Sequence, residues 1–129
     1  MLIGGVGPDG PRIFEINGGD QIPKNDMGYS TIGSGKQPAS AEFLETEYDT
    51  VCDFKQALAT VTTATLRARR ASGVGGNIDI YAVGENYIER ADENTIQALE
   101  DRYNRIAEDQ RRLKNEIHER EDVGWDPQS

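Results

Sequence analysis

The sequence predicts an α+β fold, with one antiparallel sheet, helices that cover it and a long C-terminal helix. Short apolar runs bounded by Gly-rich turns predict strands near the start of the chain and again at 77–83. Two central segments carry apolar residues at helical spacing, and the last third repeats such residues every three or four positions. At 129 residues, the chain is one domain or less.

Three strands and two turns are predicted within the first 33 residues. The turn signals are GPDG at 7–10 and NGGD at 17–20. The polar stretch at 21–28 predicts a loop. The expected strands are 1–6, 11–16 and 29–32.

Two helices are predicted in the middle of the chain. The first begins at Pro38, because proline suits the first turn of a helix. The second spans 53–70, with Thr50 and Asp53 at the spacing of a capping box. Each helix places its apolar residues on one stripe. These stripes are Ala41, Leu44 and Tyr48 in the first helix, and Phe54, Ala57, Leu58, Val61, Thr65 and Ala68 in the second.

The last third predicts two short strands and one long helix. The strands are NIDIYAV at 77–83 and the YIER that follows it, and the helix spans 92–121. Its apolar residues follow a heptad with Gln110 as the polar position, which indicates a helix partner, with packing on the chain's own sheet as the alternative. The heptad residues are Ile96, Leu99, Tyr103, Ile106, Leu113 and Ile117. Residues 1–121 form the predicted folded unit, and 122–129 a disordered tail.

Both faces of the predicted sheet are apolar. Ile13 and Phe14 are neighbours in one strand, and Ile80 and Tyr81 are neighbours in another. Because adjacent residues of a strand point to opposite faces, both faces need cover. The chain supplies helices for one face only, so we expect a second layer from a partner chain or from upstream sequence.

Composition and charge exclude several classes of function. A net charge of −9 repels nucleic acid, and no apolar run reaches the roughly eighteen residues that cross a membrane. Cys52 and His118 are each alone, so neither an internal disulfide nor a zinc site can form. We expect no cofactor, no metal and a reducing, cytoplasmic compartment. The acid surplus, with only four lysines, favours a haloarchaeal or similar source over an ordinary acidic cytosolic protein.

Two familiar catalytic motifs are incomplete. GSGK at 33–36 resembles the end of a phosphate-binding loop, but Ser30 and Gln37 stand where that loop needs Gly and Ser or Thr. No GxSxG elbow surrounds Ser34, and the one histidine lies in the charged terminal helix, which argues against a serine–histidine triad. Asp79 lies inside an apolar predicted strand, where a carboxylate needs backbone donors or a cation, so we expect a structural role for it.

Five segments of the sequence, taken together and in their order, indicate a resemblance to a known family. They are LIGGV at 2–6, GPRIFEINGGD at 10–20, STIGSGKQPASAEFLETEYD at 30–49, the helix at 53–70 and SGVGGNIDIYAV at 72–83. In this order they resemble the C-terminal half of a proteasome core-particle subunit, in the N-terminal-nucleophile hydrolase superfamily. The resemblance covers about residues 1–105.

The resemblance implies a four-layer αββα sandwich, of which this chain supplies much of one sheet and its covering helices. It also implies a threonine nucleophile whose own amine serves as the base, assisted by a lysine and an aspartate. All three belong to the first half of that fold, and Met1 cannot take the threonine's place. The implied partners are other proteasome-type subunits in a ring, or the missing N-terminal half.

The resemblance also points to supporting positions that are present here. Active members read GSGS where this chain reads GSGK, and they carry Asp and Ser where it has Ala and Val. The positions are Gly33, Ser34 and Gly35 of the loop, and Lys36, Ala71 and Val74 of the supporting network. With these replacements, we expect a non-catalytic subunit of a barrel-shaped proteolytic complex. The alternative is the C-terminal part of an active threonine-type endopeptidase.

Overall fold

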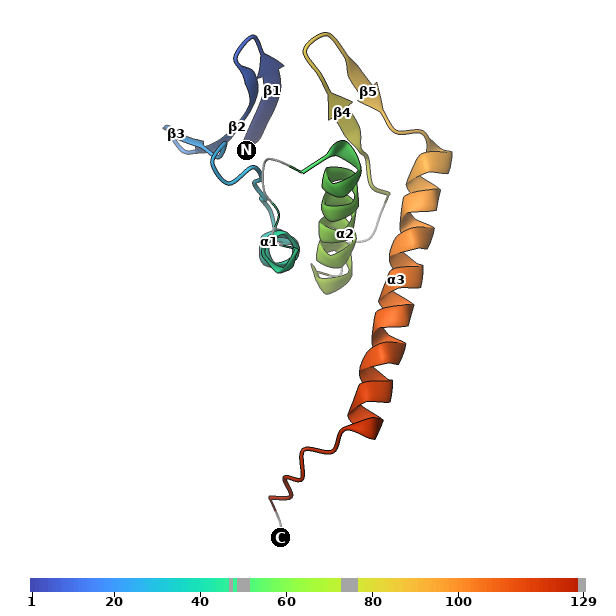
Figure 1. The fold of residues 1–129 in the computed structure, drawn as a ribbon. Coiled ribbons are helices and arrows are strands. Elements are labelled where there is room, and N and C mark those ends of the chain that lie inside the picture. Colours follow the sequence, from blue (N-terminus) through green and yellow to red (C-terminus); the bar gives the residue numbers. More distant parts are fainter. Residues whose placement is uncertain (47, 49–51, 73–76, 128–129) are drawn as a thin grey trace.

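A computed structural model describes residues 1–46, 48, 52–72 and 77–127, and it confirms the α+β class (Figure 1). The order of elements is the expected one: three strands, two helices, two strands and a long helix. The elements are β1 (Leu2–Gly7), β2 (Gly10–Asn17), β3 (Asp20–Pro23), α1 (Lys36–Glu45), α2 (Phe54–Ser72), β4 (Tyr81–Val83), β5 (Ile88–Arg90) and α3 (Glu93–Arg120).

Within the described residues, the strands form two antiparallel sheets where the sequence predicted one. The first has the order β1-β2-β3, and the second is the β4-β5 hairpin. The third strand is 20–23 and not 29–32, as predicted, because Gly18 adopts a positive φ of 64° and the chain reverses at once. Asn17 therefore pairs with Asp20 directly across the turn. The segment 29–32 has no strand structure.

Helix α1 begins two residues before Pro38 and buries a different stripe from the predicted one. Ala39 and Phe43 are buried, whereas Leu44 is 70% exposed. The reason is an aromatic cluster that fixes the rotation of the helix. The ring of Tyr29 stacks on Phe43 with centroids 4.3 Å apart, and Tyr48 packs edge-on against both rings.

Helix α2 begins with a reciprocal cap three residues after the predicted one. The Asp53 carboxylate accepts from the Gln56 backbone N–H at 2.8 Å, and the Gln56 amide oxygen accepts from the Asp53 backbone N–H at 3.0 Å. Thr50, the predicted cap, lies outside the described residues. The cap fixes the start of the helix on which the rest of the fold packs.

The buried face of α2 differs from its predicted apolar stripe. Ala64 and Leu66 are buried, whereas Phe54 and Val61 of the predicted stripe are exposed. The stripe lines an open cleft of about 680 Å³, whose other walls come from β2, β4 and the aromatic residues beside α1. An apolar stripe on an open cleft indicates that something else covers it.

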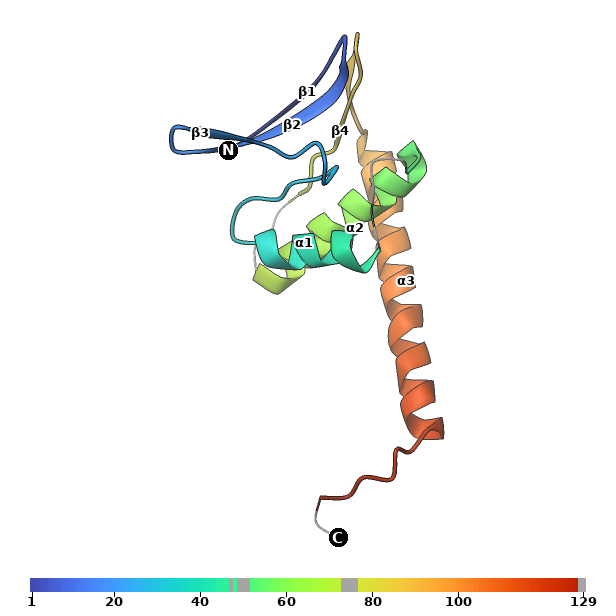
Figure 2. The ribbon, with the colours of Figure 1, turned by 60° about the vertical axis from the view of Figure 1, so that its left-hand side comes forward.

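Helix α3 packs on α2 through its first half only. Asp92 caps its N-terminus by accepting from the Thr95 backbone N–H at 2.7 Å. Ile96 is buried with Leu66, and the Arg70 guanidinium lies 5.5 Å from the centre of the Tyr103 ring. Beyond that point, α3 projects away from the other elements (Figures 1 and 2). Within the described residues, none of the helices combines the length and the apolar character that crossing a bilayer requires.

Helices α1 and α2 lie on one side of the strands, and no described segment lies on the other side of the strands (Figure 2). Ile13 and Glu15 of β2 face the helices, since Ile13 lines the cleft on α2 and Glu15 contacts Lys36. By strand alternation, Phe14 and its partner Ile3 face away. In the second sheet, Ile88 is 73% exposed. The expected one-sided cover of the strands is therefore present.

Leu66→Ala tests the core on α2. Leu66 is 3% exposed, so we expect a loss of about 2–3 kcal/mol in the free energy of unfolding from the cavity left behind. Leu44→Ala is the matched control, because Leu44 also lies on a helix but is exposed, and it should change stability by less than about 0.5 kcal/mol. Urea unfolding followed by far-UV circular dichroism measures both. Equal losses would show that α1 buries Leu44 in solution.

Candidate functional site

The predicted loop lies at an open cleft of about 560 Å³. Gly33, Ser34 and Gly35 form one wall, and the end of α2 and the segment before β4 form the others. Ile78, at the floor of this cleft, is buried in the core cluster with Leu66 and Ile96. The loop therefore lies beside one of the two core clusters of the fold.

Two glycines of the loop have structural roles. Gly33 adopts a positive φ of 93°, a conformation that side chains with a Cβ rarely take. A Cβ on Gly35 would lie 2.7 Å from the Cβ of Ala68, so only glycine lets the start of α1 contact α2 this closely. The Lys36 backbone N–H donates to the Gly33 carbonyl at 3.1 Å and closes the turn.

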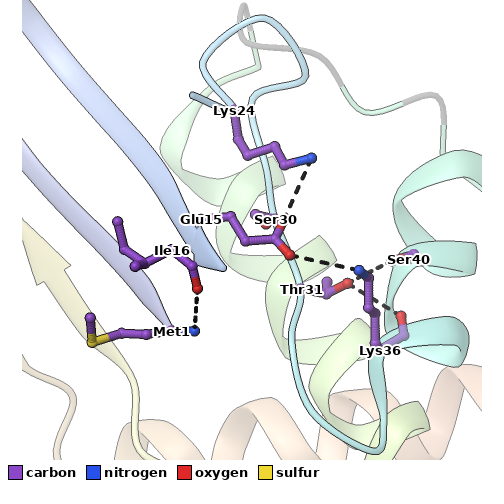
Figure 3. A network of polar contacts seen from close by, with 8 residues as sticks. All are labelled: Met1, Glu15, Ile16, Lys24, Ser30, Thr31, Lys36 and Ser40. Atoms are coloured by element: carbon purple, nitrogen blue, oxygen red, sulfur yellow. Dashed lines mark hydrogen bonds and ion pairs between the residues drawn. The ribbon is translucent and has the colours of Figure 1, made fainter. Parts of the chain in front are cut away.

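Lys36 turns its side chain toward β2 and away from the loop (Figure 3). Its Nζ lies 3.8 Å from Oε1 of Glu15, and the side chain is 56% exposed. The Lys36 carbonyl accepts from the Thr31 hydroxyl at 3.3 Å, and Thr31 also pairs with the Ser40 hydroxyl at 2.6 Å. Lys36 therefore links the start of α1 to the sheet.

Glu15 is the centre of this network, and sequence reasoning did not single it out. Its side chain is only 15% exposed. Nζ of Lys24 lies 3.6 Å from its Oε2, and the Ser30 hydroxyl donates to the same oxygen at 3.4 Å. The only sign of Glu15 in the sequence was its position as a carboxylate between two apolar residues of a predicted strand. Surrounded by two cations and a hydroxyl, this carboxylate positions the loop that leads into the cleft.

Of the other two supporting positions, the one that the structure describes does not join this network. Ala71 is exposed in the last turn of α2 and is not among the residues that line the cleft. Val74 lies outside the described residues. The structure thus brings the three loop residues to the cleft and does not bring Lys36 or Ala71 there.

Asp79 has the cationic partner that the sequence required. Its Oδ1 accepts from Nη2 of Arg90 at 2.6 Å and from Nε at 3.2 Å. Hydrogen bonding to Asp79 raises the pKa of Arg90. Asp79 precedes β4 and is well exposed, so the pair fixes the β4-β5 hairpin at the surface.

Among the described residues, the most deeply buried charge lies between α1 and α2. Glu42 is 7% exposed, and its Oε2 lies 2.8 Å from Nη1 of Arg67, which also donates to Glu45 at 2.8 Å. Burial raises the pKa of Glu42, and the Arg67 charge opposes that rise. The ion pair therefore joins the two helices beside the apolar cluster.

Catalytic groups do not converge within the described residues. Ser34 is exposed at the cleft, while His118 lies on the projecting half of α3. Cys52 is a half-buried free thiol. No group of three His, Cys, Asp or Glu side chains in the described ranges could hold a metal ion.

In comparisons with known proteins, no protein-family model matches the sequence, and neither a curated protein nor a solved structure matches the chain significantly. The resemblance to a proteasome subunit therefore rests on the five sequence segments alone.

Arg67→Gln tests the buried ion pair. Glu42 would stay buried without its cation, and because Arg67 is about one-third exposed we expect a loss of about 1–3 kcal/mol at neutral pH. Because the pKa of Glu42 is raised in the folded state, the free energy of unfolding falls as pH rises from 4.5 through that pKa. Removing the Arg67 charge raises the pKa of Glu42 further, so the variant loses more stability over this range. Urea unfolding should therefore show a larger loss at pH 7 than at pH 5.

Arg112→Gln is the matched control for this variant. Arg112 pairs with Asp109 at 3.2 Å on the exposed surface of α3, so its loss should cost less than about 0.5 kcal/mol at either pH. If Arg67→Gln lost the same small amount at both pH values, the Glu42 carboxylate would be solvated and the buried pair absent.

Proposed function

We propose that this chain is the C-terminal half of a proteasome-type subunit that contributes, without catalysing, to a barrel-shaped proteolytic complex. The observation that supports this best is the one-sided cover of the strands. Helices lie on one side of the strands only (Figure 2), and Ile3 and Ile88 of the strands are exposed. A four-layer sandwich places a second sheet at that position.

The apolar surface extends across both sheets. Ile3 of β1, and Tyr81, Val83 and Ile88 of the hairpin, are all exposed large side chains. The cleft of about 680 Å³ exposes the predicted stripe of α2 separately, on the side of the strands that faces the helices. Exposed large apolar side chains on both sheets support cover by a further layer.

The cover comes either from other proteasome-type subunits or from the missing N-terminal half. Both are chains of the same fold in this proposal, and both act in the cytoplasm. We propose that the chain acts without nucleic acid, membrane or cofactor.

The non-catalytic role is supported by the residues that surround the loop. Lys36 stands where active members of the resembled family have a serine, and it forms an ion pair with the Glu15 carboxylate. Ala71 offers no side-chain hydrogen bond at the position where active members of the family that the sequence resembles carry a carboxylate. A catalytic amine beside these groups would lack the donors and acceptors that orient it.

A fusion tests the proposed fold. The first half of a related active subunit is joined ahead of residue 1, which supplies the missing layer. We expect the fusion to melt cooperatively and to bind little 8-anilinonaphthalene sulfonate, whereas the chain alone self-associates and binds the dye strongly. Ile88→Asp should abolish the gain, and Leu44→Asp on the far side of the helices should not. If the chain without the fusion stays monomeric and binds no more dye than the fusion, the proposal is contradicted.

The same fusion, with its threonine exposed, tests the chemistry. We expect little turnover of a fluorogenic peptide, and a gain of about 10²–10⁴-fold when Lys36→Ser, Ala71→Asp and Val74→Ser are combined. Replacing the threonine by alanine is the control for background hydrolysis. Full turnover without the three reversions, lost on changing the threonine, would instead make this chain half of a working threonine endopeptidase.

A further inference from the structure

The projecting half of α3 carries an apolar stripe that the rest of the fold leaves largely open. Ile106 and Gln110 are exposed, Leu113 is 56% exposed, and Ile117 is half-buried. Figures 1 and 2 both show this part of α3 extending past α1 and α2. The stripe continues the one by which the first half of α3 packs on α2 through Tyr103.

The stripe has the spacing of a coiled-coil seam. Its residues alternate at intervals of four and three, from Leu99 to Ile117, which places Leu113 at a d position and Ile117 at an a position. A β-branched residue at a with leucine at d favours two-stranded parallel coils. We propose that the projecting half of α3 pairs with the same helix of a second copy of this chain, parallel and in register.

Charges beside the seam favour a second copy in parallel orientation. Asp109 directly precedes Gln110, which is at an a position. Lys114 lies five residues after Asp109 and directly follows Leu113, which is at a d position. In a parallel pair, Asp109 of each copy meets Lys114 of the other, which gives two attractive contacts. In an antiparallel pair, Asp109 would meet Glu116 or Asp109 of the other copy, so the attraction between Asp109 and Lys114 would be lost. Where Asp109 meets Asp109, Arg102 meets Glu116.

Glu116 is the one charge that the parallel pair places opposite a like charge, that of Glu121. Glu121 is the C-cap of α3 and lies beyond its last helical residue. It can turn away from Glu116 without breaking the helix, so the repulsion at this end is weak.

Gln110 fixes the register. In the in-register pair it meets Gln110 of the other copy, and the two side-chain amides can hydrogen-bond to each other. A shift by one heptad sets it against an apolar or aromatic residue at position 103 or 117, and an antiparallel pair sets it against Ile106 or Leu113. Its amide would then lack a partner inside an apolar seam, which is costly.

Disulfide trapping on the full chain tests the seam. In a Cys52→Ser background, Gln110→Cys places two thiols across the seam, within the Cα separation of about 4.4–6.8 Å that a disulfide allows. In a glutathione redox buffer, a non-reducing gel should show a covalent dimer. Arg112→Cys is the control, because Arg112 is exposed on the opposite side of α3, and it should give at least about tenfold less dimer.

Two further pairs of variants separate the seam from unspecific association. Leu113→Asp with Ile117→Asp should remove the Gln110→Cys dimer, whereas Asn104→Asp with Asn115→Asp, which add the same charge outside the seam, should keep it. Far-UV circular dichroism checks that α3 remains helical in both. Equal trapping at positions 110 and 112 would overturn the seam. Trapping only between Gln110→Cys and Leu113→Cys chains would overturn the parallel orientation.

Discussion

Successive turns of α2 carry the side chains that hold both parts of the core. Ala64 packs with Phe43 of α1, and Leu66 packs with Ile78 and Ile96. On the next turn, Arg67 pairs with the buried Glu42, and Ala68 meets the backbone at Gly35. The loop, α1, the segment before β4 and α3 are therefore positioned by one helix. A helix that serves neighbours on several sides needs small residues such as Ala64 and Ala68 where they approach most closely.

The order and class of the elements could be read from the sequence, because turn residues and periodicity are local signals. The NGGD turn and the capped start of α3 at Asp92 are of this kind. The position of the third strand could not be read from the sequence, because it depends on which segment the turn at Gly18 places beside β2. The rotation of α1 was also missed, because stacking between Tyr29 and Phe43 depends on tertiary packing.

The candidate site was predictable in part. GSGK marked a loop, and the glycines at 33 and 35 are required by backbone conformation and by contact with Ala68. Glu15 was hidden, because a single carboxylate in a strand gives no sign of the two lysines that approach it from later segments. The α2 stripe from Phe54 to Ala68 was recognised as apolar, but its exposure on an open cleft depends on how the strands and α1 pack around α2.

The packing partners of each element are close in sequence: β1 with β2, β2 with β3, α1 with α2, and α3 with α2 across one hairpin. Contacts of this kind give a low contact order, and chains of low contact order acquire structure in microseconds to milliseconds. In the proposed complex, covering the apolar side of the strands would by contrast be an encounter between two bodies, which is slower and depends on concentration. Under that proposal, the lifetime of the uncovered chain in the cell would be set by how much of its partner is present when the chain leaves the ribosome.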